Sequence, residues 1–295
     1  MGLSSDRGLG RVAAPGYPAA VPAFLLVGCG YVGQRVARRL LSQGEQVHAT
    51  SRDPAALGAV AAHGAVTHAL DLGDERSLDD LQRLAADLGE GLRVLVAAPP
   101  VDAGSSRLHR ALGGRPSRVV LLSTTSVYGA LSRVDERTAP APQDEAGRAW
   151  LEAERAAAAG PWAALVLRCA AIYGPGRGIH VTLREGRPGR VRDLDRVVSR
   201  VHVDDLASLA VAALRSELTG AWPVADAAPA TTREVAGFCH RLGLPRLPAS
   251  PRAPAGAGRR VDGSAIWRLL GVRPEYPSYV VGIPAALAVD GRSEP

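Results

Sequence analysis

The chain has 295 residues, of which 46% are hydrophobic and 22% charged, and it carries a formal charge of +6. This length and hydrophobic content predict a substantial buried core and exclude wholesale disorder. The three cysteines show no paired spacing, which argues against a disulfide scaffold and a structural zinc site. All 35 basic residues are arginine because the sequence contains no lysine, so a Schiff-base lysine and a P-loop lysine are excluded.

The start of the chain and its charge set expectations about location and partners. Residues 1–22 contain Pro15, Pro18 and Pro22, which break up any signal-peptide core, so a loose leader is expected. No apolar run is long enough to cross a bilayer, and scattered thiols suit a reducing compartment, so a cytoplasmic protein without membrane association is expected. The positive balance suits an anionic small-molecule ligand. Because acidic residues lie all along the chain, nucleic-acid binding is not expected.

Short apolar runs separated by helical patterns dominate the first half of the chain. The first helix repeats Val32, Val36 and Leu40, and another opens at Asp53-Pro54 with Asp53 as its N-cap. This alternation predicts an α/β fold, a Rossmann-like doubly wound parallel sheet that binds ligands at the carboxyl ends of its strands. The expected strands are Ala23–Val27, Gln46–Thr50, Val66–Leu70, Leu92–Ala97, Arg118–Leu122 and Ala163–Arg168.

The rhythm changes after Gly176, where an arginine-rich stretch replaces the strand–helix alternation. The sequence therefore predicts a Rossmann domain over residues 23–176, to which residues 200–224 return. A smaller C-terminal substrate lobe is expected from residues 177–199 and 225–290. Helices are expected at 202–214 and 264–270, the first capped by Asp204 or Asp205. The seven histidines lack H-x-x-x-H or H-E-x-x-H spacing, so no metal site is expected.

A glycine-rich turn joins the first strand to the first helix. Gly28-Cys29-Gly30-Tyr31-Val32-Gly33 matches G-x-G-x-x-G in the strand-to-helix context that supports a dinucleotide site. Gly28 would make the tight turn, Gly30 would admit the pyrophosphate, and Gly33 would let helix and strand pack closely. The phosphates would meet the free N–H groups of the helix N-terminus, near Tyr31 and Val32. A plain glycine turn is the alternative.

The end of the second strand bears on the choice of nucleotide. It reads Thr50-Ser51-Arg52, with no acidic residue at the position that selects NAD, and two hydroxyls and a guanidinium suit a 2′-phosphate. NADP is therefore favoured and NAD is the alternative. Asp71, after the third strand, is expected either to accept from the adenine amine or to cap the next turn. Ala98 and Pro99, after the fourth strand, are expected to border the same site.

Four motifs together resemble the short-chain dehydrogenase/reductase superfamily in its extended, nucleotide-sugar epimerase/dehydratase type. The resemblance runs from about Phe24 to Leu287 and implies a Rossmann-like domain, a substrate lobe, and Pro175 beside the nicotinamide. It also implies a homodimer in many members, through two helices of the nucleotide domain. The motifs are the glycine turn, Ser123-Thr-Thr-Ser-Val-Tyr-Gly129, Leu167-Arg168 with Ile172-Tyr-Gly-Pro-Gly176, and Val201-His-Val-Asp-Asp-Leu206.

The chain departs from this family at its catalytic pair. Members with known chemistry carry a Ser or Thr after the fifth strand and a Tyr-x-x-x-Lys on the next helix, where the lysine lowers the tyrosine pKa. Thr124 matches the hydroxyl residue. The tyrosine and lysine positions fall on Ala149 and Ala153, or on Ala146 and Trp150 if Glu154 sets the alignment. The pattern resembles an atypical branch of the superfamily that lacks the pair.

Two functions from different classes follow. The first is an NADP-dependent oxidoreductase or epimerase/dehydratase-like enzyme that acts on a carbonyl, a hydroxyl or a nucleotide-sugar-like small molecule. In it, Thr124 would polarise the substrate and Tyr173 or a water would carry the proton. Packing of its own loop is the alternative role for Tyr173. The second is a catalytically inactive sensor that binds NADP(H). Four arginines, at positions 184, 187, 190 and 192, are candidates for contact with an anionic substrate.

Overall fold

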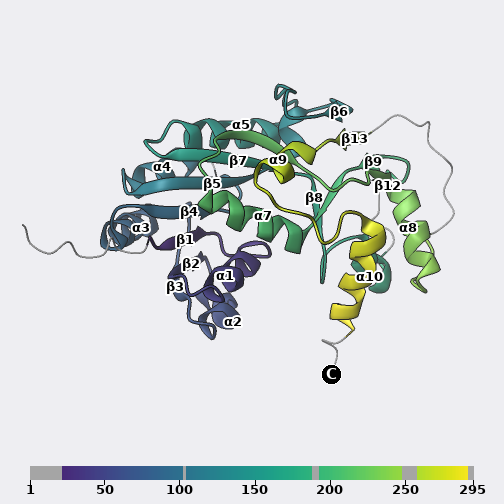
Figure 1. Ribbon diagram of the computed structural model, residues 1–295, viewed down its shortest axis with the longest axis horizontal. Coiled ribbons are helices and arrows are strands. Elements are labelled where there is room, and N and C mark those ends of the chain that lie inside the picture. The colour runs from purple at the N-terminus through teal and green to yellow at the C-terminus, as the bar shows by residue number, and fades with distance from the viewer. Residues whose placement is uncertain (1–21, 102–103, 188–192, 248–257, 292–295) are drawn as a thin grey trace, which may run out of the picture.

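A central parallel sheet organises the computed structural model, which describes residues 22–101, 104–187, 193–247 and 258–291 (Figure 1). The predicted leader lies almost wholly outside the described residues. The seven strands lie in the order β11-β7-β5-β4-β1-β2-β3, and every pair is parallel. Their bounds are β1 Phe24–Val27, β2 Val47–Ser51, β3 Val66–Ala69, β4 Leu92–Val96, β5 Pro116–Thr124, β7 Ala163–Cys169 and β11 Gly220–Val224.

Helices cover both faces of this sheet, which explains why most of its strands are continuous apolar runs. One face packs against α1 (Gly33–Leu41), α2 (Gly58–Ala61), α7 (Val203–Arg215) and α9 (Ser264–Leu269). The other packs against α3 (Glu75–Leu88), α4 (Gly104–Leu112) and α5 (Glu145–Ala158). A short 3₁₀ helix, η1 (Pro54–Leu57), precedes α2. The Rossmann-like prediction is confirmed.

Each of the six predicted strands is present, and the sequence pattern missed the seventh. β11 contains Pro223 and begins at Gly220, two residues that count against a strand. β11 lies at the edge of the sheet and pairs only with β7, so Pro223 needs no ladder partner on its outer side. Tertiary position therefore allows a strand that composition disfavours.

The C-terminal part of the chain adds two small sheets beside the carboxyl ends of the main strands. β8 (Ala171–Tyr173) pairs with β10 (Arg200–His202). The other sheet has the order β12-β9-β13-β6, and its β6 comes from the segment after β5. Its bounds are β12 Ala230–Thr231, β9 Val197–Val198, β13 Gly258–Val261 and β6 Arg133–Val134. Helices α6 (Ile179–Arg184), α8 (Thr232–Arg241) and α10 (Tyr279–Asp290) lie next to these sheets.

The start of α7 corrects one prediction. The N-cap is His202, whose Nδ1 accepts a hydrogen bond from the backbone N–H of Asp204 at 3.3 Å. Asp205 instead accepts from the backbone N–H groups of Glu275 and Tyr276, at 2.7 and 2.9 Å. Because Asp205 is buried on α7, these two hydrogen bonds hold the segment before α10 against that helix. Neither aspartate caps α7, because His202, the residue directly before the helix, does so.

Candidate functional site

The glycine turn between β1 and α1 has three glycines in three different environments. Gly28 has φ +81°, and a Cβ there would lie 2.7 Å from the Cβ of Ala98. A Cβ on Gly33 would lie 3.2 Å from the carbonyl oxygen of Gly28, so the helix packs tightly on the turn. A Cβ on Gly30 would meet no atom within 4 Å. No side chain caps the first turn of α1, so bare backbone and free N–H groups face the open space beside Gly30.

Thr50 supports the glycine turn, whereas Ser51 makes a local hydrogen bond at the end of β2. Thr50 is buried, and its Oγ1 accepts from the N–H of Gly28 at 3.1 Å and donates to the carbonyl of Leu26 at 3.2 Å. The structure therefore gives Thr50 a supporting role in the glycine turn. Ser51 is half-buried, and its Oγ accepts from the N–H of Asp53 at 3.2 Å.

Arg52 and Asp53 differ in how they are engaged. The side chain of Asp53 caps η1 by accepting from the N–H of Ala55 at 3.0 Å, so the predicted N-cap is present. Arg52 is exposed and forms no side-chain hydrogen bond or ion pair with any described residue. Asp71 is also exposed, and its Oδ1 accepts from the N–H of Gly73 at 2.9 Å, which makes a local turn. A guanidinium without a protein partner therefore stands beside the strand end at which the sequence predicted a nucleotide.

A cleft of about 670 Å³ runs from the glycine turn across the carboxyl ends of β4 and β5. Gly30, Val32 and Pro99 line one end, and Thr124 and Trp150 lie further along. The strand order changes direction at β1 and β4, which is where open α/β sheets bind their ligands. The cleft therefore coincides with the position that the topology predicts.

Tyr31 connects this cleft to the loop after β8. Its hydroxyl donates to the carbonyl oxygen of Pro175 at 2.9 Å, and the guanidinium carbons of Arg35 and Arg177 lie 4.3 and 5.4 Å from its ring centroid. Arg35 is paired with Asp204 at 3.4 Å, whereas Arg177 has no acidic partner among the described residues and lines the cleft. The tyrosine ring thus holds an unpaired positive charge beside the open face of the glycine turn.

The expected catalytic positions hold one hydroxyl and no titratable pair. Thr124 is half-buried at the end of β5, and its Oγ1 accepts from the N–H of Ser126 at 3.2 Å to cap the 3₁₀ helix η2 (Thr125–Tyr128). Trp150 projects from α5 to line the cleft, while Ala146 lies exposed four residues earlier. The indole of Trp150 therefore contributes an apolar wall where one alignment put the family's lysine.

Tyr173 lies in the packed interior beside α10 and not in the wall of the cleft. Its ring packs edge-on against His202 with centroids 5.2 Å apart, and a Cβ on Gly282 of α10 would lie 2.3 Å from its hydroxyl. Tyr173 is buried, it does not line the cleft that holds the glycine turn, and burial raises its pKa above that of a free tyrosine. This environment favours the packing role that the sequence gave as the alternative for Tyr173.

A buried polar chain behind Thr124 was not anticipated. Ser123 Oγ donates to Glu154 at 2.6 Å, Glu154 pairs with Arg168 at 2.7 Å, and Arg168 donates to the hydroxyl of Tyr128 at 3.1 Å. Burial alone would lower the pKa of Arg168, but its hydrogen bonds with Glu154 and Tyr128 raise it overall. The sequence marked these residues separately as family features, but their spacing along the chain gives no sign that they meet.

Arginines gather at the far end of the cleft, although not the ones expected. Arg196 is exposed and has no side-chain partner among the described residues, and Arg259 donates to the carbonyls of Thr125, Gly129 and Leu131. Of the four arginines singled out earlier, Arg184 pairs with Asp290 and Arg187 with Glu185, while the other two lie outside the described residues. The cleft is therefore positive at both ends.

Metal and thiol chemistry find no support around the cleft. Within the described ranges, no three His, Cys, Asp or Glu side chains are grouped to hold a metal ion. His202 is buried and its pKa is lowered to about 4 by burial, so it is neutral near neutral pH. Burial raises the pKa of the Cys29 thiol to about 12, which keeps it protonated inside the glycine turn. No helix among the described residues is long and apolar enough to span a bilayer.

The fold, the topological switch and the glycine turn place the protein in the Rossmann-like α/β class. No family model matches the chain. Two solved structures align along nearly their whole length. One is a functionally unknown conserved protein of Silicibacter pomeroyi, 31% identical, which covers 91% of this chain and 99% of that one with a TM-score of 0.71. The other is a proposed NAD-dependent epimerase/dehydratase of Methylobacillus flagellatus, with 26% identity, 92% and 99% coverage and a TM-score of 0.74.

Two curated proteins and a further solved structure are also similar to this chain. Protein YeeZ of Escherichia coli is 27% identical over 274 residues, covering 87% of this chain and 97% of that protein. The 3-diazoavenalumate denitrifying reductase of a Streptomyces species is 36% identical over 122 residues, 37% of this chain and 38% of that one. The enzyme WbmG of Bordetella bronchiseptica, solved with NAD and UDP, shares the fold at 18% identity, a TM-score of 0.75 and coverage of 92% and 94%. The chain therefore shares its fold with structural neighbours that are NAD-dependent epimerase/dehydratase family members of the extended short-chain dehydrogenase/reductase superfamily.

Proposed function

We propose that this protein binds NADP(H) in the cleft above the glycine turn and transforms a small anionic substrate at a carbonyl or hydroxyl carbon. The observation that carries the proposal is the open space beside Gly30, which is flanked by free helix N–H groups and continuous with the pocket that Thr124 lines. A dinucleotide pyrophosphate requires backbone that it can approach without a Cβ in the way. The residues present fit that group.

Different side chains along the cleft would contact different parts of the nucleotide and the substrate. Ser51, Arg52 and Asp71 would face the adenosine end, and Arg177 the phosphates. A bound nicotinamide supplies hydride transfer. Thr124 would hold the substrate oxygen by a hydrogen bond, and Arg196 would receive its anionic group. No tyrosine–lysine pair lines the described part of the cleft, so a water would carry the proton.

The preference for NADP rests on Arg52. It stands unpaired beside the end of β2, where an acidic residue would select NAD. Charge-assisted bonds from a guanidinium to a phosphate are stronger than neutral hydrogen bonds, so a 2′-phosphate gains more from this position than a hydroxyl.

The relatives support a substrate with a polar or anionic end. WbmG was solved with UDP, and a UDP-glucuronic acid 4-epimerase of Bacillus cereus that shares the fold at 17% identity was solved with UDP-glucuronic acid. The arginine-lined far end of this cleft is compatible with such a ligand. A carbonyl compound is the other candidate, because the Streptomyces relative is a reductase.

One experiment tests the catalytic proposal. NADPH oxidation and NADP⁺ reduction are followed with a panel of carbonyl compounds and nucleotide sugars, in the natural protein and in Thr124→Val. Turnover that falls at least about tenfold in the variant, with NADPH affinity unchanged, is the expected result. Undiminished turnover in Thr124→Val removes this residue from the mechanism.

A nucleotide sensor without chemistry is the second candidate, and a specific observation favours it. Trp150 lines the cleft where a proton-relay lysine would stand in one alignment, and the chain holds no lysine anywhere. Tight NADPH binding without turnover across the whole panel would favour this reading. A single substrate with saturable kinetics excludes it.

A further inference from the structure

A tight turn after β8 carries Arg177 to the edge of the cleft above the glycine turn. Gly174 and Arg177 exchange two backbone hydrogen bonds, of 2.9 and 3.0 Å, with Pro175 and Gly176 between them. Gly176 has φ +72°, and a proline followed by a residue with positive φ is typical of a type II turn. Types I and II differ in the orientation of the central peptide unit, so contacts that hold this unit fix the shape of the turn.

Both polar groups of this central peptide unit are bonded to distant parts of the chain. The carbonyl oxygen of Pro175 accepts a hydrogen bond from the hydroxyl of Tyr31, in the glycine turn, at 2.9 Å. The N–H of Gly176 donates to Oδ1 of Asp290, the last residue of α10, at 2.9 Å. Asp290 lies 114 positions beyond Gly176 in the sequence. Because a peptide unit is planar, the two hydrogen bonds together fix its orientation.

The surroundings of Asp290 make it a strong acceptor for this N–H. Its side chain is 8% exposed, and Nη1 of Arg184 on α6 lies 3.2 Å from its Oδ2. A hydrogen bond to an ionised carboxylate is stronger than one between neutral groups, and a site with little water strengthens it further. Arg184 balances the charge on one side of the carboxylate, which leaves Oδ1 as the acceptor for the turn.

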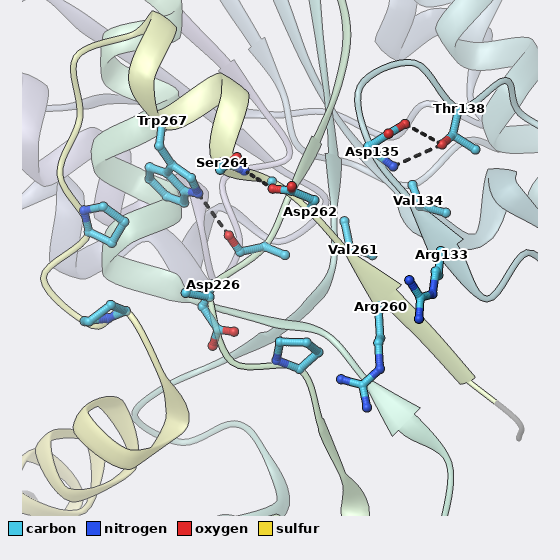
Figure 2. A pocket seen from close by; sticks show the side chains of 16 residues that line it. Arg133, Val134, Asp135, Thr138, Asp226, Arg260, Val261, Asp262, Ser264 and Trp267 are labelled. Atoms are coloured by element: carbon cyan, nitrogen blue, oxygen red, sulfur yellow. Dashed lines mark hydrogen bonds between the residues drawn. The ribbon is translucent and has the colours of Figure 1, made fainter. Parts of the chain in front are cut away.

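Helix α10 is fixed where it begins and where it passes Tyr173. The carbonyl oxygen of Pro277, just before the helix, accepts from the N–H of Ala227 at 3.1 Å. Pro277 also lines a second cavity, of about 750 Å³, which shares no lining residue with the cleft, so this contact is made away from the cleft (Figure 2). Along the helix, a Cβ on Gly282 would lie 2.3 Å from the hydroxyl of Tyr173, the residue before the turn. Close packing therefore holds the helix, and Asp290 with it, beside the turn.

The turn places Arg177 against the ring of Tyr31. The guanidinium carbon of Arg177 lies 5.4 Å from the ring centroid, and Arg177 lines the cleft without an acidic partner among the described residues. Gly30, on which a Cβ would meet no atom within 4 Å, lines the same cleft. An arginine side chain loses rotamer freedom when it binds a phosphate, and one that is already held loses less. A diphosphate beside Gly30 would therefore meet a guanidinium that the turn has positioned in advance.

We propose that Asp290 is a positioning residue for nucleotide binding. Through the peptide unit between Pro175 and Gly176 it holds Arg177 beside the glycine turn, where the guanidinium receives the pyrophosphate. The inference rests on the proposed nucleotide site and adds to it a residue of the C-terminal helix that does not itself line the cleft. Loss of the carboxylate would free the peptide unit to rotate and release Arg177 from its place, with the central sheet unchanged.

Calorimetry of NADPH binding to the full chain tests this coupling. Asp290→Ala and Arg177→Gln should each weaken binding about tenfold, because the first frees the turn and the second removes the charge. If Asp290 acts through Arg177, the double variant should bind within about twofold of Arg177→Gln alone. Asp290→Asn keeps an acceptor oxygen and should bind within about threefold of the natural chain. The control is Asp87→Ala, at an exposed acidic residue near the end of α3, which should bind NADPH as the natural chain does.

Two further measurements examine the turn itself. Amide hydrogen exchange without nucleotide should show the Gly176 N–H exchanging at least about tenfold faster in Asp290→Ala than in the natural chain, at a similar melting temperature. Tyr31→Phe keeps the ring beside Arg177 but releases the other end of the peptide unit. It should weaken NADPH binding in the same direction, and it keeps the test open if Asp290→Ala does not fold.

The outcomes separate this inference from the proposed function. A natural chain that binds no NADPH would overturn the proposed function, and the role of Asp290 with it. If the natural chain binds NADPH, unchanged affinity in Asp290→Ala or in Arg177→Gln would overturn the role of Asp290 alone. Losses that multiply in the double variant, or unchanged exchange at Gly176, would overturn it as well, because the carboxylate would then not act through the turn.

Discussion

At the scale of the residue, glycine positions that look equivalent in the sequence differ in what they tolerate. Gly28 combines a positive φ with a contact that a methyl group would violate, whereas Gly30 faces open space. The motif alone does not distinguish structural from ligand-facing glycines. The atoms opposite each Cα do.

This difference yields a prediction for two alanine variants. Gly30→Ala should fold with a melting temperature near that of the natural protein but bind NADPH at least about tenfold more weakly, because its methyl group occupies the space of the pyrophosphate. Gly28→Ala should instead be destabilised by roughly 2–3 kcal/mol, from the strained φ and the contact with Ala98. Thermal unfolding and calorimetry distinguish the two. If Gly30→Ala retains full affinity, the nucleotide does not bind beside this residue.

The proposed preference for NADP also rests on one residue. Arg52→Ala should weaken NADPH binding by about tenfold and leave NADH binding unchanged, because only NADPH carries the 2′-phosphate. Arg38→Ala serves as the control, since Arg38 is an exposed arginine on α1 that forms no side-chain ion pair with a described residue. Equal affinities for the two nucleotides in the natural protein contradict the role given to Arg52.

At the scale of the element, the ion pair between Glu154 of α5 and Arg168 of β7 holds this helix against the sheet. Both side chains are buried, and Ser123 and Tyr128 complete their hydrogen bonds. The pair lies directly behind Thr124, so it also fixes the end of β5 that presents this hydroxyl to the cleft.

Breaking the pair from one side should be strongly destabilising. Arg168→Met leaves Glu154 buried without a counter-charge, for which a loss of about 3–5 kcal/mol in the free energy of unfolding is expected. The control is Arg155→Met, at an exposed position of α5, next to Glu154. It should change the free energy of unfolding by less than about 0.5 kcal/mol. Urea unfolding of both variants provides the measurement, and similar losses in the two would contradict the argument.

At the scale of the whole molecule, buried histidines make stability depend on pH. His109 is 8% exposed, packs against Trp162 with ring centroids 5.6 Å apart, and has no hydrogen-bond partner for either ring nitrogen among the described residues. Burial lowers its pKa to about 4. The unfolded chain, with a pKa near 6.5, therefore takes up a proton between pH 6.5 and 4 that the folded protein does not.

The free energy of unfolding therefore falls in acid. Stability contributed by neutral His109 is complete above pH 6.5 and is lost as the pH falls towards 4, by an amount on the order of 3 kcal/mol. Asp226, whose pKa is raised to about 6 by burial, acts in the opposite direction between about 4 and 6. His109→Leu should therefore flatten the loss of stability in acid, measured by urea unfolding from pH 7 to 4. An unchanged slope would show that His109 is not the cause.

Local pattern determined much of the fold. The apolar runs, the glycine turn and the Asp53-Pro54 helix start each depend on neighbouring residues, so the six predicted strands and this cap are present. β11 was missed because this strand depends on its position at the edge of the sheet. The His202 cap was missed because adjacent side chains compete to cap α7.

The amino-acid sequence by itself determined the parallel sheet and the place of the cleft beside the glycine turn, because these follow from periodicity and from glycines at fixed spacing. Only the tertiary structure decided which polar groups are free. It buried Tyr173 and Thr50 and joined Ser123 to Glu154 and Glu154 to Arg168. Within the described part of the chain, it also left Arg52, Arg177 and Arg196 without an ion-pair partner. Pairing and burial depend on contacts between segments far apart in the chain, which no local pattern records.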